Sequence, residues 1–247
     1  MLKSERKRLI LDKIHSDGVA SLDDLMQLLA TSESTVRRDL EELASQGLLR
    51  RVHGGAEKPK LLQEELSNQQ KSVKNVQAKK CLAQAAASLI ADEEVIFIDA
   101  GTTTSLLIKE LGQKNLTVVT NSIQHANDLA AKGIETIMIG GFVKQATNAN
   151  IGLIAVEQIN QLNFDKAFLG INGIDANSIT TPDMAEAMVK KAIIKNAKET
   201  YILADSSKLD QVYFVTVAAV EEVTIISNQT EQSLIALLRE KTKVITI

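Results

Sequence analysis

The stretch Ser32-Glu33-Ser34-Thr35-Val36-Arg37-Arg38-Asp39-Leu40-Glu41-Glu42-Leu43 decides the fold of the first part of this chain. Val36, Leu40 and Leu43 recur at the i, i+4, i+7 spacing of one helix face, which predicts a buried stripe. Ser32 is a candidate N-cap, because its hydroxyl can accept a backbone N–H bond from the first turn. A helix whose first turns present hydroxyls and two guanidinium groups fits a DNA major groove. The predicted base-reading residues are Ser34, Thr35, Arg37 and Arg38.

Two more helices are predicted before this stretch. The first has an apolar pattern and ends at Asp17-Gly18. The second opens at Ser21, with Asp24 three residues on in the arrangement of a capping box. Its expected buried face consists of Leu22, Leu25, Met26, Leu28 and Leu29. With the turn Ala30-Thr31-Ser32, the three helices predict a helix-turn-helix unit.

A β-hairpin wing is predicted directly after the third helix, which Gly47 terminates as the C′ residue. The segment 48–56 supplies apolar anchors and a Gly-Gly turn. Arg50 and Arg51 are expected near DNA phosphates, and His53 either contacts phosphate or holds the hairpin. Lys3 and Arg6 are further candidates for backbone contacts. The alternative is a small helical bundle whose arginines form only a solvated face.

Composition excludes several classes of protein. The 247 residues carry a net charge of −3 and one cysteine, Cys81, so no internal disulfide framework can form. No apolar stretch is long enough to span a bilayer and no signal peptide is visible, so a cytoplasmic protein without membrane attachment is expected. The predicted organisation is a winged helix-turn-helix domain over 1–57, a polar linker over 58–75 and a larger domain over 76–247.

The larger domain alternates short apolar runs with helical patterns, which predicts an α/β fold around a largely parallel sheet. Strands are expected near 95–98, 116–119, 134–139, 166–169, 201–203 and 223–226, with further candidates at 214–217 and 244–247. Helices are expected near 76–91, 103–112, 122–132, 183–198 and 230–241.

Ligands bind such sheets at the carboxyl ends of the strands. The loop Asp99-Ala100-Gly101-Thr102-Thr103-Thr104-Ser105 follows a strand and opens a helix, so its N–H groups and hydroxyls can surround a phosphate. Gly101 would let the backbone approach that ligand closely. No dinucleotide or nucleoside-triphosphate motif occurs, and neither a cofactor nor a metal is expected. The alternative is that the threonines only cap their helix.

Four other loops are expected at the same edge. They contribute Thr120 and Asn121, the pair Gly140-Gly141, Asp175, and Lys208. Hydroxyls and amides suit a phosphate, a carboxylate suits sugar hydroxyls and a lysine supplies positive charge. Together with Asp99, Gly101, Thr102, Thr103 and Thr104, this set predicts a pocket for a phosphorylated sugar.

The segments 35–40 and 47–56 together resemble the N-terminal signature of the DeoR family of bacterial transcription regulators, and the loops resemble that family's effector domain in order. The resemblance implies a Rossmann-like α/β effector domain similar in fold to ribose-5-phosphate isomerase, with a sugar phosphate as inducer. The segment Ile179-Thr180-Thr181-Pro182-Asp183, with Glu186 and Lys190, resembles the subgroup that represses fructose operons. That subgroup implies fructose 1-phosphate as the effector.

Three positions depart from the family pattern. Ala78-Lys79 stands where Glu-Lys is common, and Lys144 stands where an arginine often follows the Gly-Gly pair. A lysine cannot make the flat bidentate fork of arginine. Ser178 replaces a usual glycine and disfavours a positive φ at that position.

The leading hypothesis is a non-enzymatic repressor that binds double-stranded operator DNA and is released by a sugar phosphate. Two-fold DNA sites favour two-fold proteins, so a homo-dimer or tetramer is expected. A second hypothesis is a sugar-phosphate isomerase with an added DNA-binding unit, in which Asp99, Asp175, Asp205 and Lys208 do acid–base work. A third is a DNA-binding protein without an effector.

Overall fold

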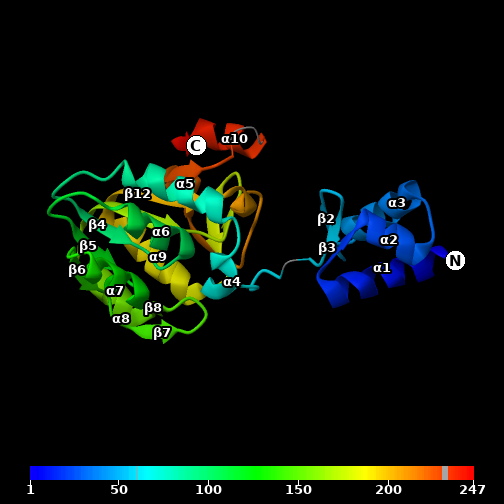
Figure 1. The fold of residues 1–247 in the computed structure, drawn as a ribbon, viewed down its shortest axis with the longest axis horizontal. Helices are drawn as coiled ribbons and strands as arrows, with labels where there is room; N and C mark the ends of the chain where they lie inside the picture. Colours follow the sequence, from blue (N-terminus) through cyan, green and yellow to red (C-terminus); the bar gives the residue numbers. More distant parts are fainter. Residues whose placement is uncertain (60, 230–232) are drawn as a thin grey trace. The chain divides into compact units, whose positions relative to one another are not determined.

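The computed structural model describes residues 1–59, 61–229 and 233–247, and the chain divides into two compact units, Met1–Leu61 and Leu62–Ile247 (Figure 1). The smaller unit contains α1 (Lys3–Asp17), β1 (Val19–Ser21), α2 (Leu22–Leu29), α3 (Glu33–Ser45), β2 (Arg50–Val52) and β3 (Gly55–Glu57). Its three short strands form an antiparallel sheet in the order β1-β3-β2. This is the predicted winged helix-turn-helix unit, with β1 as a strand that the sequence patterns did not indicate.

The helix boundaries of the smaller unit follow the predicted capping residues. Gly18 ends α1 at a φ of 79°, and Ser21 and Asp24 form the capping box of α2. Ser32 is the N-cap of α3, but its hydroxyl bonds the hydroxyls of Ser34 and Thr35 instead of a backbone N–H, so the side-chain cap was wrongly predicted. The core is aliphatic and includes Ile10, Ile14, Leu25, Val36, Leu40 and Leu43.

Leu28 is a second correction in this unit. It was expected in the buried face of α2, yet it is 43% exposed. The core-facing stripe of this eight-residue helix consists of Leu22, Leu25 and Leu29, which are spaced three and four residues apart. Leu28 lies one helical step, about 100°, away from Leu29 and therefore off that stripe.

The larger unit is built on a seven-stranded sheet in the order β15-β14-β12-β9-β4-β5-β6, with every neighbouring pair parallel. The strands are β4 (Val95–Ile98), β5 (Thr117–Thr120), β6 (Glu135–Met138), β9 (Phe164–Gly170), β12 (Ala197–Ala204), β14 (Thr224–Ser227) and β15 (Val244–Thr246). The parallel α/β prediction is confirmed. The candidate strand at 244–247 is confirmed as β15, which lies at one edge of the sheet, and β6 lies at the other.

Helices cover both faces of this sheet (Figure 1). Because successive strand residues point to opposite faces, Ile96 and Ile98 pack with α5 (Val76–Ala87) and α6 (Thr102–Glu110). Phe97, between them, packs on the other face with α8 (Leu153–Ile159) and α9 (Met184–Asn196). The two remaining helices of this layer structure are α7 (Ile123–Ala131) and α10 (Ser233–Lys241). Of the predicted helix over 230–241, Ser233–Lys241 form α10, and the first three positions lie outside the described residues.

Smaller elements complete the larger unit, and the sequence patterns missed all but one of those named here. They are the hairpin β7 (Phe142–Lys144) and β8 (Ala149–Ile151), helix α8, and the antiparallel sheet β10 (Gly173–Ile174), β11 (Ser178–Thr181) and β13 (Val215–Ala219). Only β13 was anticipated, as the candidate strand over 214–217. Within the described residues, no helix is both long and apolar enough to cross a membrane.

The linker predicted over 58–75 is a correction, because its second half belongs to the larger unit. Ser67 and Gln70 form a capping box that starts the short helix α4 (Asn68–Ser72). The side chain of Asn68 donates to the carbonyl of Thr147 at 2.5 Å, and its backbone N–H donates to the carbonyl of Ala146 at 2.9 Å. These polar residues are therefore bonded to the α/β unit and do not form a free connection.

Candidate functional site

The side chains predicted to read DNA bases lie at the surface of α3. Ser34, Arg37 and Arg38 are exposed, and Thr35 is half-buried. Arg37 pairs with Glu33 one turn earlier at 2.6 Å, in the exposed i, i+4 geometry that contributes little to stability. Arg38 makes no ion pair with any described residue. The front of α3 therefore presents one engaged and one open guanidinium group.

Two of the candidate backbone-binding cations have structural partners instead. Arg6 donates two hydrogen bonds to Asp39, at 2.7 and 3.2 Å, and Asp39 is 1% exposed. A buried carboxylate requires such a partner, so Arg6 fastens α1 to α3. Lys3 and Lys7 bond Glu42 at 2.6 and 2.8 Å and lower the pKa of that carboxyl to about 2. These ion pairs join α1 to α3 and fix the orientation of α3.

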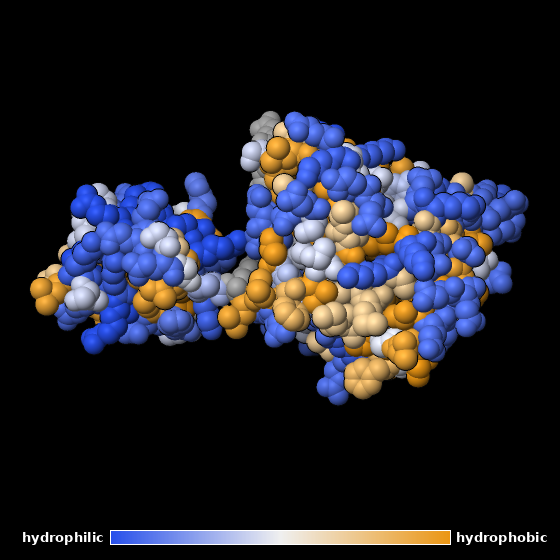
Figure 2. All heavy atoms as spheres, turned by 180° about the vertical axis from the view of Figure 1, so that it is seen from behind, coloured by the Kyte–Doolittle hydropathy of each residue, from blue (hydrophilic) through white to orange (hydrophobic). Residues whose placement is uncertain are grey.

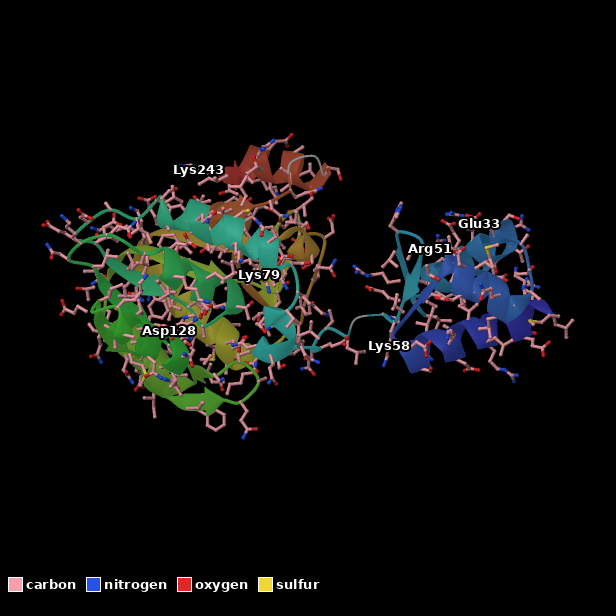
Figure 3. All side chains as sticks on the ribbon, in the orientation of Figure 1. Glu33, Arg51, Lys58, Lys79, Asp128 and Lys243 are labelled. Atoms are coloured by element: carbon pink, nitrogen blue, oxygen red, sulfur yellow. The ribbon has the colours of Figure 1, made fainter. Side chains whose placement is uncertain are left out.

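The two arginines of the wing have different partners, and only Arg51 reaches α3. Arg50 bonds Glu57 at 2.6 Å, across the β2–β3 pair. Arg51 donates to the backbone carbonyl of Arg37 at 3.3 Å, so it connects the wing to the helix (Figure 3). His53 is exposed at the turn. Gly55 is required by packing, because a Cβ there would collide with the carbonyl oxygen of Ala20 in β1.

In the larger unit, a pocket opens at the carboxyl end of the sheet. Of the residues predicted to bind the effector, Gly101, Thr102, Thr103 and Lys208 line it. Thr102 and Thr103 begin α6, so the free N–H groups of that helix lie at the pocket wall. The φ of Gly101 is 177°, which is ordinary extended backbone, so this glycine is not needed for an unusual conformation.

Thr104 lies outside the pocket lining, and it does not cap α6 either, because no side chain among the described residues accepts an N–H group at the start of this helix. Its hydroxyl donates to the carbonyl of Gly101 at 3.0 Å, and the side chain is fully buried. Asp99 is also buried, and Lys190 of α9 bonds its carboxylate. Lys190 itself lines the pocket. Asp99 therefore holds a pocket lysine in place and does not face the ligand space directly.

Thr120 and Asn121 do not line the pocket. Their side chains make hydrogen bonds beside the loop 99–105, which we call the threonine loop. The Asn121 side-chain oxygen accepts the backbone N–H of Ala100 at 2.9 Å, and Thr120 accepts the N–H of Ser122 at 3.2 Å. Both side chains are at most 2% exposed. Their position directly after a strand predicts pocket residues. Their side chains turn inward instead.

The other predicted pocket residues serve local structure, which is a further correction. Gly140 donates to the side chain of Gln158 at 3.0 Å, and Gly141 has a φ of 144° in close contact with β8. Asp175 accepts the N–H groups of Asn177 and Ser178 at 2.8 and 2.7 Å, closing the turn between β10 and β11. None of the three lines the pocket. Ser178 lies in β11 without a positive φ, so its replacement of glycine causes no strain.

The pocket also contains residues absent from the predicted set. They come from α4, α5, the loop after β7 and α9, and are Asn68, Lys71, Lys79, Thr147, Glu186 and Lys190. Strand-end reasoning could not find them, because most lie within helices. The one available signal was the resemblance, which had already drawn attention to Lys79, Glu186 and Lys190.

Lys79 is the most unusual side chain of the pocket (Figure 3). It is 4% exposed, and its ammonium donates to the backbone carbonyl of Lys71. Burial lowers its pKa and the charge of Lys71 adds to this, while the charge of Asp205 acts in the opposite direction. Within the described residues it forms no salt bridge, since Asp205 bonds Asn75 and Ser207 instead. A buried ammonium without a carboxylate is costly unless an anion joins it.

A series of ion pairs connects α4 to the residues that line the pocket. Glu65 bonds Lys71 at 3.1 Å and Lys144 at 2.5 Å, and Lys144 also lies 3.2 Å from Glu186. Burial alone would lower the pKa of Lys144, but its bond to Glu65 and the nearby carboxylates raise it. Lys144 thus meets several carboxylates, and Glu186 also accepts a hydrogen bond from Thr147 at 2.8 Å. As a compact charge with three donors, lysine suits this position.

His125 lies beneath the threonine loop. It is 2% exposed, and its Nε2 is 3.3 Å from the carbonyl oxygen of Gly101. Its Nδ1 is buried and has no hydrogen-bond partner within the described part of the chain. Burial lowers the pKa of this imidazole, although the charge of Asp99 and the bond to Gly101 oppose the effect. The neutral ring therefore supports the loop that opens α6.

A winged helix-turn-helix unit with exposed arginines, followed by an α/β unit with a cationic pocket, defines a DNA-binding transcription regulator with a ligand-sensing domain. The DeoR-like helix-turn-helix domain matches residues 6–60, and the DeoR C-terminal sensor domain matches residues 74–229. The chain belongs to the DeoR family of transcriptional regulators, as the sequence motifs indicated.

Relatives match over nearly the whole chain. An uncharacterized HTH-type transcriptional regulator FruR of Bacillus subtilis (strain 168) is 41% identical over 99% of this chain and 98% of its own length. The lactose phosphotransferase system repressor of Streptococcus mutans is 33% identical over 91% of each chain. Among solved structures, ribose 5-phosphate isomerase A of Methanocaldococcus jannaschii aligns over 55% of each chain, at 21% identity and a TM-score of 0.41.

Proposed function

We propose that this protein is a transcriptional repressor that a sugar phosphate releases from operator DNA, and that fructose 1-phosphate is the effector. The observation that carries the proposal is the buried ammonium of Lys79, which has no carboxylate partner among the described residues and lines a pocket that also contains the start of α6. A phosphate would satisfy both the ammonium and the free N–H groups of the helix.

The rest of the pocket suits a sugar. Asn68, Thr103 and Asn172 offer amide and hydroxyl groups, and Glu186 offers a carboxylate oxygen for sugar hydroxyls. Fructose is favoured over other sugars by the segment 179–183 and by the similarity to a regulator named FruR. The lactose phosphotransferase repressors among the relatives make other sugar phosphates the necessary comparison.

The isomerase alternative requires a free acid–base group. Asp99 is occupied by Lys190, Asp205 accepts bonds from Asn75 and Ser207, and Asp175 closes a turn outside the pocket. These three carboxylates act as structural acceptors, and of the four groups named for acid–base work only Lys208 lines the pocket, which favours binding without turnover. Incubation with ketose and aldose phosphates, followed by product analysis, tests this directly, and isomerised product would establish the enzyme.

We propose that the effector changes DNA binding through the segment that contains Glu65 and α4, at the start of the larger unit. Lys71 lines the pocket, while its partner Glu65 lies in the stretch that leads from the DNA-binding unit. A phosphate near Lys71 would compete with Glu65 and change how that stretch is held. For such an effect, the effector must prefer one arrangement over another, and a coupling of about 1–3 kcal/mol is typical.

The test of the proposal is a thermal-shift panel on the full chain. Fructose 1-phosphate is expected to raise the melting temperature more than fructose 6-phosphate, glucose 6-phosphate, free fructose or inorganic phosphate. In a second assay it should displace the protein from DNA fragments that the protein itself selected. A panel in which every sugar phosphate leaves the melting temperature unchanged would refute the effector class.

A further inference from the structure

An apolar surface lies at the β6 end of the seven-stranded sheet. Six large apolar residues there are each 41–72% exposed: Ile137, Met138, Phe142, Val143, Leu153 and Ile154. We call them the edge surface. Figure 2 shows apolar side chains gathered over the lower part of the larger unit, where Figure 1 places β7 and α8. Exposed apolar patches of this kind mark interaction sites in soluble proteins.

The elements that carry the edge surface are joined to one another. Strand β6 leads within four residues into β7, which pairs with β8 so that Phe142 lies opposite Ile151. Helix α8 begins at Leu153, directly after β8, and packs its buried Ala155 close to Gly141. The six residues therefore come from elements that adjoin one another at this end of the sheet.

Strand β6 is uncovered on both faces near its end. Ile137 and Met138 are consecutive, so they point to opposite faces of the sheet, and they are 43% and 48% exposed. In the neighbouring strand β5, Val118 and Val119 are both buried. No charged residue occurs between Thr136 and Val143. Edge strands that remain in solvent usually carry charges that prevent pairing. The charge of this strand, Glu135, lies at its first residue, and the end that holds Ile137 and Met138 has none.

We infer that the edge surface binds the same surface of a second copy of this chain. A two-fold contact places a surface against itself, which an apolar, uncharged patch permits and a patch of one charge would oppose. The exposed area of six such residues is on the order of several hundred Å², comparable with the roughly 800 Å² per partner of a standard interface. A winged helix-turn-helix unit reads one half-site, so a two-fold copy supplies the second.

Sedimentation velocity of the full chain tests this inference. The wild type is expected to sediment as a dimer or larger, against a monomer mass of 26.9 kDa. Ile137→Lys adds a charge to the edge strand and Leu153→Glu adds one to α8, and each should at least halve the assembly mass. The matched control is Leu237→Glu on α10, which replaces an apolar residue that is 47% exposed outside the edge surface. It should keep the wild-type mass.

Folding of each variant is checked by circular dichroism and by the melting temperature. Should Ile137→Lys fail to fold, Phe142→Ser replaces the most exposed residue of the six and should also reduce the mass. A monomeric wild type at micromolar concentration overturns the inference. So does a folded set of edge variants that all retain the wild-type mass. The sugar-phosphate thermal shift of these variants reports separately on the proposed effector pocket.

Discussion

The ammonium of Lys190, on α9, bonds the carboxylate of Asp99, the first residue after β4, across 91 positions of sequence. Their side chains are only 6% and 3% exposed. This buried pair joins the helix layer on one face of the sheet to the loop that opens α6. It explains why a carboxylate at the head of the threonine loop need not contact the ligand in order to shape the pocket.

The Asp99–Lys190 pair predicts that removing one partner destabilises the protein more than removing both. Asp99→Asn leaves the Lys190 charge buried without its counterion and should lower the free energy of unfolding by about 3 kcal/mol, whereas Asp99→Asn with Lys190→Met should recover much of that loss. Urea unfolding of the wild type, the two single variants and the double variant measures the coupling. Additive losses in the double variant would show that the two groups do not interact.

Lys79 is predicted to bind the anion of the effector. Lys79→Met should weaken fructose 1-phosphate binding by at least about tenfold, because the charge-assisted bond is lost. The melting temperature of the free protein should stay the same or rise, because a desolvated charge is removed. Isothermal titration calorimetry measures the affinity.

The neighbouring Lys80 provides a matched control for that experiment, since it is exposed and lies about 100° around the axis of α5 from the buried Lys79. Lys80→Met should bind the effector like the wild type. Equal affinities in the Lys79→Met and Lys80→Met variants would remove Lys79 from the site.

Arg38 is predicted to read a base. Arg38→Ala should cost about 1–3 kcal/mol of operator binding, roughly 5–150-fold in Kd, and should relax specificity at one position. The assay is fluorescence anisotropy with a duplex selected by the wild-type protein from random sequences. Arg8→Ala removes an exposed arginine from α1 and serves as the control. If the two variants lose affinity equally on all sequences, Arg38 contributes only general charge.

His125 predicts a pH dependence of stability. Its pKa is lowered from 6.5 by burial, so above this value both the folded and the unfolded state carry a neutral ring. As the pH falls through the unfolded-state value, the unfolded chain binds the proton first, and stability is lost until the folded-state pKa is passed. The melting temperature should therefore drop as the pH is lowered from about 7.5 to about 5.5.

Two variants isolate this contribution. His125→Gln keeps a donor near Gly101 without titrating and should show a smaller drop, whereas His53→Asn, at an exposed position, should follow the wild type. Parallel curves for the wild type and His125→Gln would mean that other groups cause the pH dependence.

Local patterns in the sequence were sufficient for most of the fold. The capping box at Ser21 and Asp24, Gly18 after α1 and the apolar run at 95–98 all act through neighbours in sequence, so each could be recognised without a structure. Short elements such as β1 and β10 were missed, because two or three residues carry no periodicity and form strands only where a partner strand is available.

Only part of the candidate pocket could be predicted from local sequence patterns. The threonine loop could be found because it follows a strand and starts a helix. Thr120 and Asn121 follow the next strand in the same manner, yet their side chains turn inward and support the loop. Which way a loop side chain points depends on the elements packed around it, and no pattern of neighbouring residues contains that information.

The amino-acid sequence by itself determined the winged helix-turn-helix unit, the parallel α/β sheet and the family, because periodicity, caps and motifs are local properties. Tertiary structure alone decided that Lys79 and Lys190 meet the threonine loop, that Arg6 holds α3 in place, and that β6 is left as an open apolar edge. Those relationships join residues that are distant in sequence, and only the packing of helices on one another and on the open sheet brings them together.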